Sequence, residues 1–230
     1  MVYKKKSAVM CFYYLMAVDN DIQDIEKETF DSIAKEIDPE KYESYKDSIS
    51  EEYSKQIETI IDEEDYYDVI VEGVDKYLVP KEKPEGVTSR LLLWDLLVVA
   101  FSDGEYSQLE RKLIKHIVRV SEIEKSVFLE MEQLMKANDA VSKEIESLEK
   151  SDKPYNEIRP MIEELEERRN VIIESAKALI EDETYVPVAK VEKPEKDIFD
   201  KIGDGVSSTV TPIASSIGDG AKKLWGSIFK

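Results

Sequence analysis

Two stretches of the chain share one pattern of hydrophobic and acidic positions. Apolar runs over residues 8–18 and 91–101 are each followed by a short acidic turn and then by apolar residues at helical spacing. The turns begin at Asp19 and Asp103 and share the pattern D-[NG]-[DE]-apolar-x-x-[IL]-E. Apolar positions every three or four residues indicate amphipathic helices. The pattern therefore predicts an internal duplication of one helix–acidic turn–helix unit.

Helical spacing of apolar residues continues through most of the chain. We expect the first helix to begin at Ser7, as its N-cap, and Pro80 and Pro84 to divide the fold into the halves 7–80 and 89–183. No strand pattern appears before residue 184. We therefore expect an all-α domain of seven or eight helices over residues 1–183. Beyond the two repeat units, the helical stretches are 42–61, 66–79, 122–150 and 155–181, the last two forming an antiparallel hairpin.

The composition changes after Glu183. Residues 184–197 contain two prolines and alternating charges, as linkers do, and residues 198–230 hold five of the eight glycines. An apolar stripe at helical spacing runs along this last stretch, opposite a Gly, Ser and Thr face, which predicts an amphipathic tail that lies on a membrane surface or packs against protein. The residues expected to make that membrane or partner contact are Ile213, Ile217, Leu224, Trp225, Ile228 and Phe229.

Charge limits the classes of function. The chain has 51 acidic and 32 basic residues among 230, a formal net charge of −19, which argues against nucleic acid as a partner. One cysteine and one histidine exclude a disulfide framework and a His-rich metal site. The lysines at 4–6 and the apolar run after them resemble a signal peptide, but no small-x-small cleavage site follows. We therefore expect a cytoplasmic protein.

The two acidic turns are the best candidates for chemistry. Hard cations such as Ca²⁺ and Mg²⁺ prefer several oxygen ligands, and packing of the two units about a pseudo-twofold axis would bring the turns together. The turns are not EF-hands, because Phe30 and Ile114 stand where the EF-hand loop needs its last acidic ligand. The predicted metal ligands are Asp19, Asp21, Glu26, Asp103, Glu105 and Glu110.

Helix capping is the competing interpretation of the same residues. Ser107 and Glu110 have the spacing of a capping box, and Gly104 suits a tight turn. In the first copy Gln23 replaces the serine although Glu26 is present. Because Gln is a poor N-cap, this difference favours metal binding over capping alone.

The second copy also resembles a known family. An apolar helix ending in Ala100, followed by Asp103, Gly104, Ser107 and Glu110, is similar to the tellurite-resistance TerB-like domain. The first copy matches less well because Asn20 replaces the glycine, and Ser102 departs from the alanine that usually precedes the Asp of the motif. The resemblance covers residues 7–150. It implies an all-helical fold of duplicated hairpins, acidic residues associated with divalent cations, and a role with partner proteins in stress responses at the inner face of the membrane.

Three functions are compatible with these features. The leading one is a non-catalytic acidic module that binds a divalent cation and protein partners. The second is a metal-dependent phosphohydrolase that uses the same carboxylates, which would need a basic-lined pocket beside them for a phosphate. The third is a structural adaptor in which the acidic turns are only caps.

Overall fold

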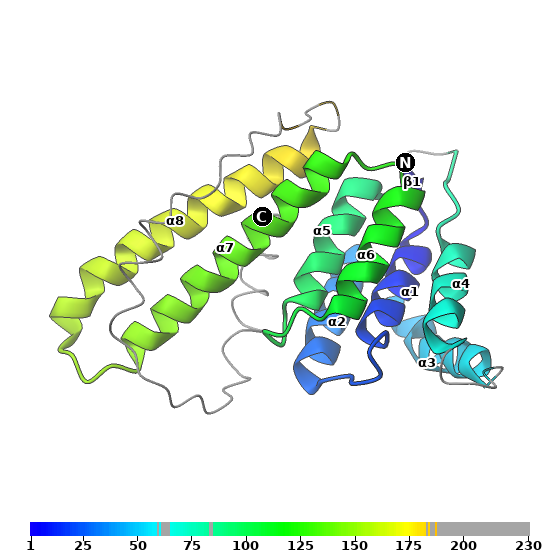
Figure 1. Ribbon diagram of the computed structural model, residues 1–230, viewed down its shortest axis with the longest axis horizontal. Helices are drawn as coiled ribbons and strands as arrows, with labels where there is room; N and C mark the ends of the chain where they lie inside the picture. The colour runs from blue at the N-terminus through cyan, green and yellow to red at the C-terminus, as the bar shows by residue number, and fades with distance from the viewer. Residues whose placement is uncertain (59, 61–64, 83–84, 183, 185–186, 188–230) are drawn as a thin grey trace.

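The computed structural model describes residues 1–58, 60, 65–82, 85–182, 184 and 187 (Figure 1). This part of the chain folds into eight α-helices and one two-stranded ladder, which confirms the predicted all-α fold. The helices are α1 (Lys5–Met16), α2 (Asp24–Ile37), α3 (Tyr42–Ile57), α4 (Tyr66–Tyr77), α5 (Ser89–Ala100), α6 (Gln108–Val120), α7 (Lys125–Glu149) and α8 (Tyr155–Glu181).

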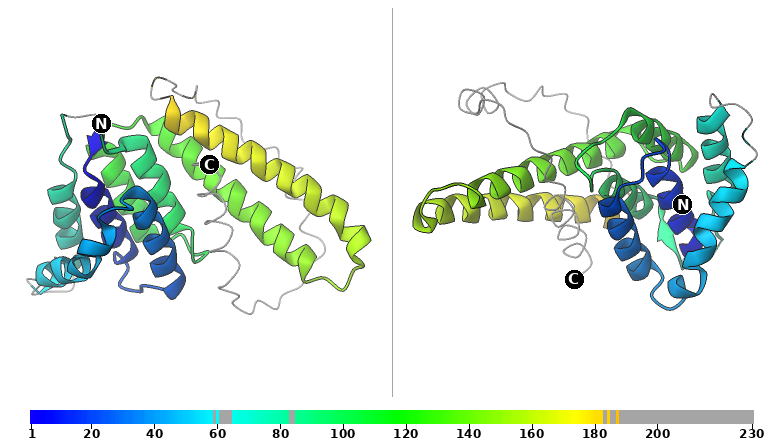
Figure 2. Two further views of the ribbon diagram at one scale, coloured as in Figure 1. Left: turned by 180° about the vertical axis from the view of Figure 1, so that it is seen from behind. Right: turned by 90° about the horizontal axis from the view of Figure 1, so that it is seen from below.

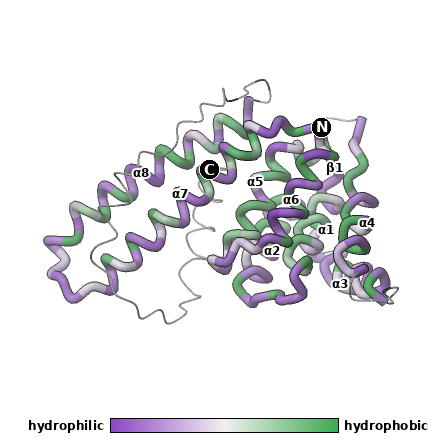
Figure 3. The backbone as a smooth tube through the Cα atoms, viewed as in Figure 1, coloured by the Kyte–Doolittle hydropathy of each residue, from purple (hydrophilic) through white to green (hydrophobic). Residues whose placement is uncertain are grey.

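The two apolar runs form α1 and α5, the central helices of the core. They pack against each other, and α2, α4 and α6 cover them (Figure 1). Phe12 of α1 and Trp94 of α5 are completely buried. Both helices are hydrophobic around most of their circumference because neighbours surround them, whereas α6 carries one apolar stripe and an outer charged face (Figure 3).

The last two helices form the predicted hairpin. Helices α7 and α8 lie antiparallel, and their far ends extend away from the other helices (Figure 2). Near the bundle, Met135, Ile173 and Ala176 belong to the main core. Farther out, Val141, Ile145 and Leu165 form a separate small hydrophobic cluster. The hairpin therefore has one end fixed in the core and one end held only by its own packing.

Two details of the prediction are wrong. A short ladder pairs β1 (Val2–Tyr3) with β2 (Val87–Thr88), where no strand was expected, because two residues are too few for a visible alternation. Helix α1 begins at Lys5 with Lys4 in the N-cap position, so Ser7 is not the cap. The ladder sets this earlier start, because it fixes the chain immediately before the helix.

The predicted tail lies outside the described residues, as does the linker apart from residues 184 and 187. The six tail positions expected to contact a membrane or partner are therefore not placed: Ile213, Ile217, Leu224, Trp225, Ile228 and Phe229. Within the described part of the chain, no helix combines the length and the hydrophobicity that crossing a membrane requires.

Candidate acidic site at the paired turns

The two acidic turns have the same local geometry. In the first, Asp19 Oδ1 accepts a hydrogen bond from the Asp21 amide at 3.2 Å, and in the second Asp103 Oδ1 accepts one from the Glu105 amide at 2.8 Å. The residue after each aspartate has a positive φ, 63° at Asn20 and 86° at Gly104. Asn and Gly are the residues that adopt this conformation most readily, which explains how Asn20 can replace the glycine.

The next helix begins in the same way after both turns. Glu26 Oε2 accepts the Gln23 amide at 2.7 Å, and Glu110 Oε2 accepts the Ser107 amide at 2.7 Å. Ser107 Oγ accepts the Glu110 amide in return, at 3.1 Å. Gln23 was expected to argue against capping in the first copy, and this is wrong. The Glu26 carboxylate caps the helix by accepting the backbone amide of Gln23, an interaction that does not depend on the side chain at position 23.

Fold packing brings the carboxylates of the two turns into each other's electrostatic field. Glu26 and Glu110 are only 4% and 3% exposed. Burial raises the pKa of Glu26 to about 7, and the charges of Asp103, Asp19 and Asp21 contribute. Burial likewise raises the pKa of Glu110 to about 8, with contributions from Asp19 and Glu26. The pKa of each buried glutamate therefore depends in part on charges in the other half of the molecule.

The turn aspartates belong to the same group. Burial raises the pKa of the half-buried Asp103, and the charges of Glu105 and Asp19 contribute. The charge of Asp19 thus contributes to the raised pKa values of Asp103 and of both buried glutamates, although its own side chain is exposed. Asp21 and Glu105 are also exposed and lie at the edge of the group. We call Asp19, Glu26, Asp103 and Glu110 the acidic cluster.

Glu132 shows how this chain holds a buried carboxylate that has a basic partner. It is as buried as Glu110, at 3% exposure, but the Arg111 guanidinium binds both of its oxygens, at 2.6 and 3.0 Å. Burial by itself would raise the pKa of Glu132, and the cations of Arg111 and Lys136 outweigh it and hold the pKa below its usual range. Among the described residues, no ion pair of this kind reaches the acidic cluster. When its carboxylates ionise, the negative charge of the cluster is therefore neutralised only by protons or an added cation.

The carboxylates are not arranged as a finished metal centre. Across the described part of the chain, no three His, Cys, Asp or Glu side chains are placed so that they could hold a metal ion together. All four cluster carboxylates already accept a backbone amide. Both capping glutamates accept these amides through Oε2.

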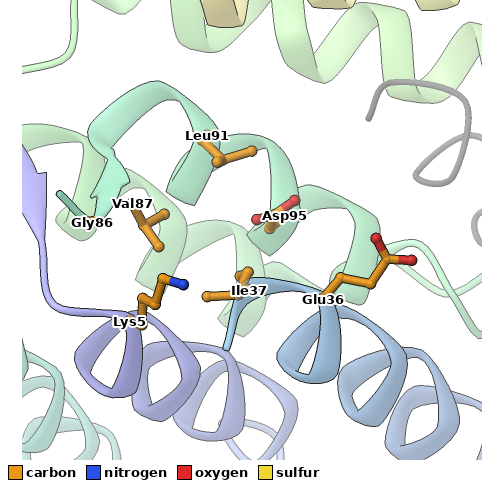
Figure 4. Close-up of a pocket in the computed structure, with 7 residues that line it drawn as sticks. All are labelled: Lys5, Glu36, Ile37, Gly86, Val87, Leu91 and Asp95. Atoms are coloured by element: carbon orange, nitrogen blue, oxygen red, sulfur yellow. The ribbon is translucent and has the colours of Figure 1, made fainter. Parts of the chain in front are cut away.

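A separate pocket lies between α1, α2 and α5 (Figure 4). Its volume is about 220 Å³, and its lining residues are Lys5, Glu36, Ile37, Gly86, Val87, Leu91 and Asp95. It contains none of the six predicted metal ligands, so it is not the phosphate pocket that a hydrolase acting through the turns would need. The lone thiol is no better placed for catalysis, because Cys11 is buried and burial raises its pKa.

A basic groove on the outer side of α6 was not predicted from the sequence. The signal was visible in the spacing of Arg111, Lys115 and Arg119, since residues four apart share one helix face. No family model, curated protein or solved structure was found to match this chain.

Proposed function

We propose that this protein is a non-catalytic helical module whose acidic cluster takes up one divalent cation, Ca²⁺ or Mg²⁺, between the two halves of the fold. The observation that supports this is the acidic cluster itself, in which two buried glutamates have raised pKa values and no ion pair with a base in the described residues. Mg²⁺ keeps several of its waters and commonly binds through one or two carboxylates, and Ca²⁺ accepts irregular oxygen sets. Neither ion requires all six predicted ligands.

Cation uptake would be an exchange for protons. With pKa values of about 7 and 8, Glu26 and Glu110 hold protons near neutral pH, and a divalent cation would displace them. Because Glu26 and Glu110 belong to different halves, one ion bound between their carboxylates would link α2 to α6 while both helix caps stay in place. The expected consequence is a more rigid module at higher pH in the presence of the ion.

The cellular role that we propose follows from the TerB-like resemblance of Ala100, Asp103, Gly104, Ser107 and Glu110. It is a cytoplasmic, membrane-proximal part of a stress response that acts through partner proteins, with the tail as a peripheral contact. A structural adaptor is the second candidate, and the four backbone hydrogen bonds to the acidic cluster favour it. A metal-dependent phosphohydrolase is the catalytic alternative.

Thermal unfolding with and without the ion tests the proposal. At pH 8, millimolar Ca²⁺ or Mg²⁺ should raise the Tm of the wild type, because a ligand that binds only the folded state stabilises it. The double variant Asp103→Asn, Glu110→Gln should lose that increase. The control Asp47→Asn, Glu51→Gln removes the same charge from exposed positions of α3 and should keep it. A wild-type Tm that does not respond to either ion would leave the turns as caps and favour the adaptor.

A further inference from the structure

A basic groove lies between α6 and the beginning of α7. Its volume is about 800 Å³. The charged residues that line it are all basic: Arg111, Lys115, Arg119 and Lys125. Its apolar lining consists of Val118, Ile123, Phe128 and Leu129. Such a surface is unexpected on a chain that carries 19 more acidic than basic residues, since a random arrangement would place carboxylates along it.

Three of the four cations are available to a ligand. Lys115 and Lys125 are exposed and have no ion pair with any described residue, and the exposed Arg119 donates a hydrogen bond to His116 Nδ1 at 3.1 Å. Arg111 is different, because Glu132 holds its guanidinium at one side of the groove. Other exposed lysines, such as Lys55 and Lys76, also have no ion pair with a described residue, so the groove is distinguished by the combination of unpaired cations with an apolar floor.

The apolar lining is recessed. Phe128, Val118 and Ile123 are 3%, 7% and 8% exposed, so they form a floor below the cations and do not project from the surface. A membrane surface requires projecting apolar side chains, which this recessed floor does not provide. A recessed floor instead accepts apolar side chains that a partner inserts, as in recognition of an amphipathic helix by a groove.

We propose that this groove binds an acidic, amphipathic segment of a partner protein. Apolar side chains of the segment, spaced by three or four residues, occupy the floor of Val118, Ile123 and Phe128, and its Asp or Glu side chains pair with Lys115, Arg119 and Lys125. At 0.1 M salt the Debye length is about 10 Å, so the distant acidic surface is screened while the groove cations act at contact distance. The inference rests on the partner-binding part of the proposed function but uses none of the acidic cluster.

Binding of designed peptides to the full chain tests it. The probe is a fluorescent 14-residue helical peptide with Leu at positions i, i+3, i+4 and i+7 and Glu beside them. Matched peptides carry Gln or Lys in place of Glu, or Ser in place of Leu. Fluorescence anisotropy in 0.1 M NaCl should give a Kd at least tenfold lower for the Glu peptide than for each of the three others. Raising the salt to 0.5 M should weaken this binding severalfold.

Two protein variants locate the site. Lys115→Gln, Lys125→Gln should raise the Kd of the Glu peptide at least tenfold. The control Lys76→Gln, Lys112→Gln makes the same charge change at neighbouring exposed lysines outside the groove and should leave the Kd unchanged. Equal affinity for the Glu and Gln peptides, equal losses in both variants, or binding of anionic vesicles that Lys115→Gln, Lys125→Gln abolishes would overturn the inference. Calcium titration of the same samples reports separately on the acidic cluster, so either proposal can fail alone.

Discussion

Replacing Glu110 by Gln separates the charge of this residue from its role as a helix cap. The Gln side chain keeps a carbonyl oxygen that can accept the Ser107 amide, now bonded at 2.7 Å, but it cannot ionise. In the wild type, the pKa of Glu110 rises from 4.5 to about 8 on folding. Between these values the folded state holds a proton that the unfolded state has released, so the free energy of unfolding falls as pH rises from about 4.5 to 8. The Glu110→Gln variant does not lose stability in this way, because its side chain at position 110 cannot ionise.

The size of the effect follows from the pKa. Each pKa unit corresponds to about 1.4 kcal/mol, so the rise from 4.5 to about 8 means that ionising Glu110 costs the folded state about 5 kcal/mol. Movement of the exposed Asp19 side chain and screening by salt reduce this cost. We therefore expect Glu110→Gln to raise the free energy of unfolding by about 2–4 kcal/mol at pH 9 and to leave it nearly unchanged at pH 5.

Urea unfolding of both proteins at pH 5, 7 and 9, in EDTA, measures the difference. Glu26→Gln should act in the same direction, with its transition near pH 7. The double variant should gain less than the sum, because Glu26 and Glu110 repel each other when both are ionised. A Glu110→Gln protein that is no more stable than the wild type at pH 9, or a difference that is the same at pH 5 and pH 9, would refute the reasoning.

Two further predictions concern other parts of the chain. A Cβ added at Gly73 would clash with Cε1 of the buried Tyr14 ring, whose hydroxyl donates a hydrogen bond to Gln56 at 2.7 Å. Gly73→Ala should therefore lower the free energy of unfolding by about 1–3 kcal/mol despite the better helix propensity of Ala, and a gain measured by urea unfolding would contradict this. The sequence of the tail predicts that the full chain floats with anionic vesicles and that a chain ending at Asp197 does not, whereas equal flotation of the two would make the tail a protein contact.

The helices could be predicted from sequence because their apolar spacing is local. Residues 155–181 were expected to form a helix, and α8 has those bounds. The turns could be recognised because Asp19 and Asp103 stand in the same local pattern, and their hydrogen bonds and positive-φ residues agree. The two-residue strands could not be predicted, since the pairing of Val2 with Thr88 joins two segments that are distant in the sequence and leaves no local pattern.

The behaviour of the acidic residues could not be obtained from sequence, because it depends on which helices pack together. Glu110 and Glu132 look alike in the sequence, as acidic residues in amphipathic helices. Their opposite pKa shifts arise because Arg111 points toward Glu132, while α2 and α6 place Glu26 and Glu110 in one acidic cluster. Six equivalent ligands were therefore expected, whereas packing buries two of them and leaves Asp21 and Glu105 at the edge.

Proton release during calcium titration tests the central claim, that the carboxylates of both turns act as one site. The titration is done by calorimetry at pH 7.5 in buffers of different ionisation enthalpy. With pKa values of about 7 and 8, the two glutamates together hold about one proton at this pH, so binding of one Ca²⁺ should release about one proton. Asp19→Asn in the first turn and Asp103→Asn in the second should each weaken binding. Calcium binding without proton release, or binding that either single change leaves intact, would contradict the account.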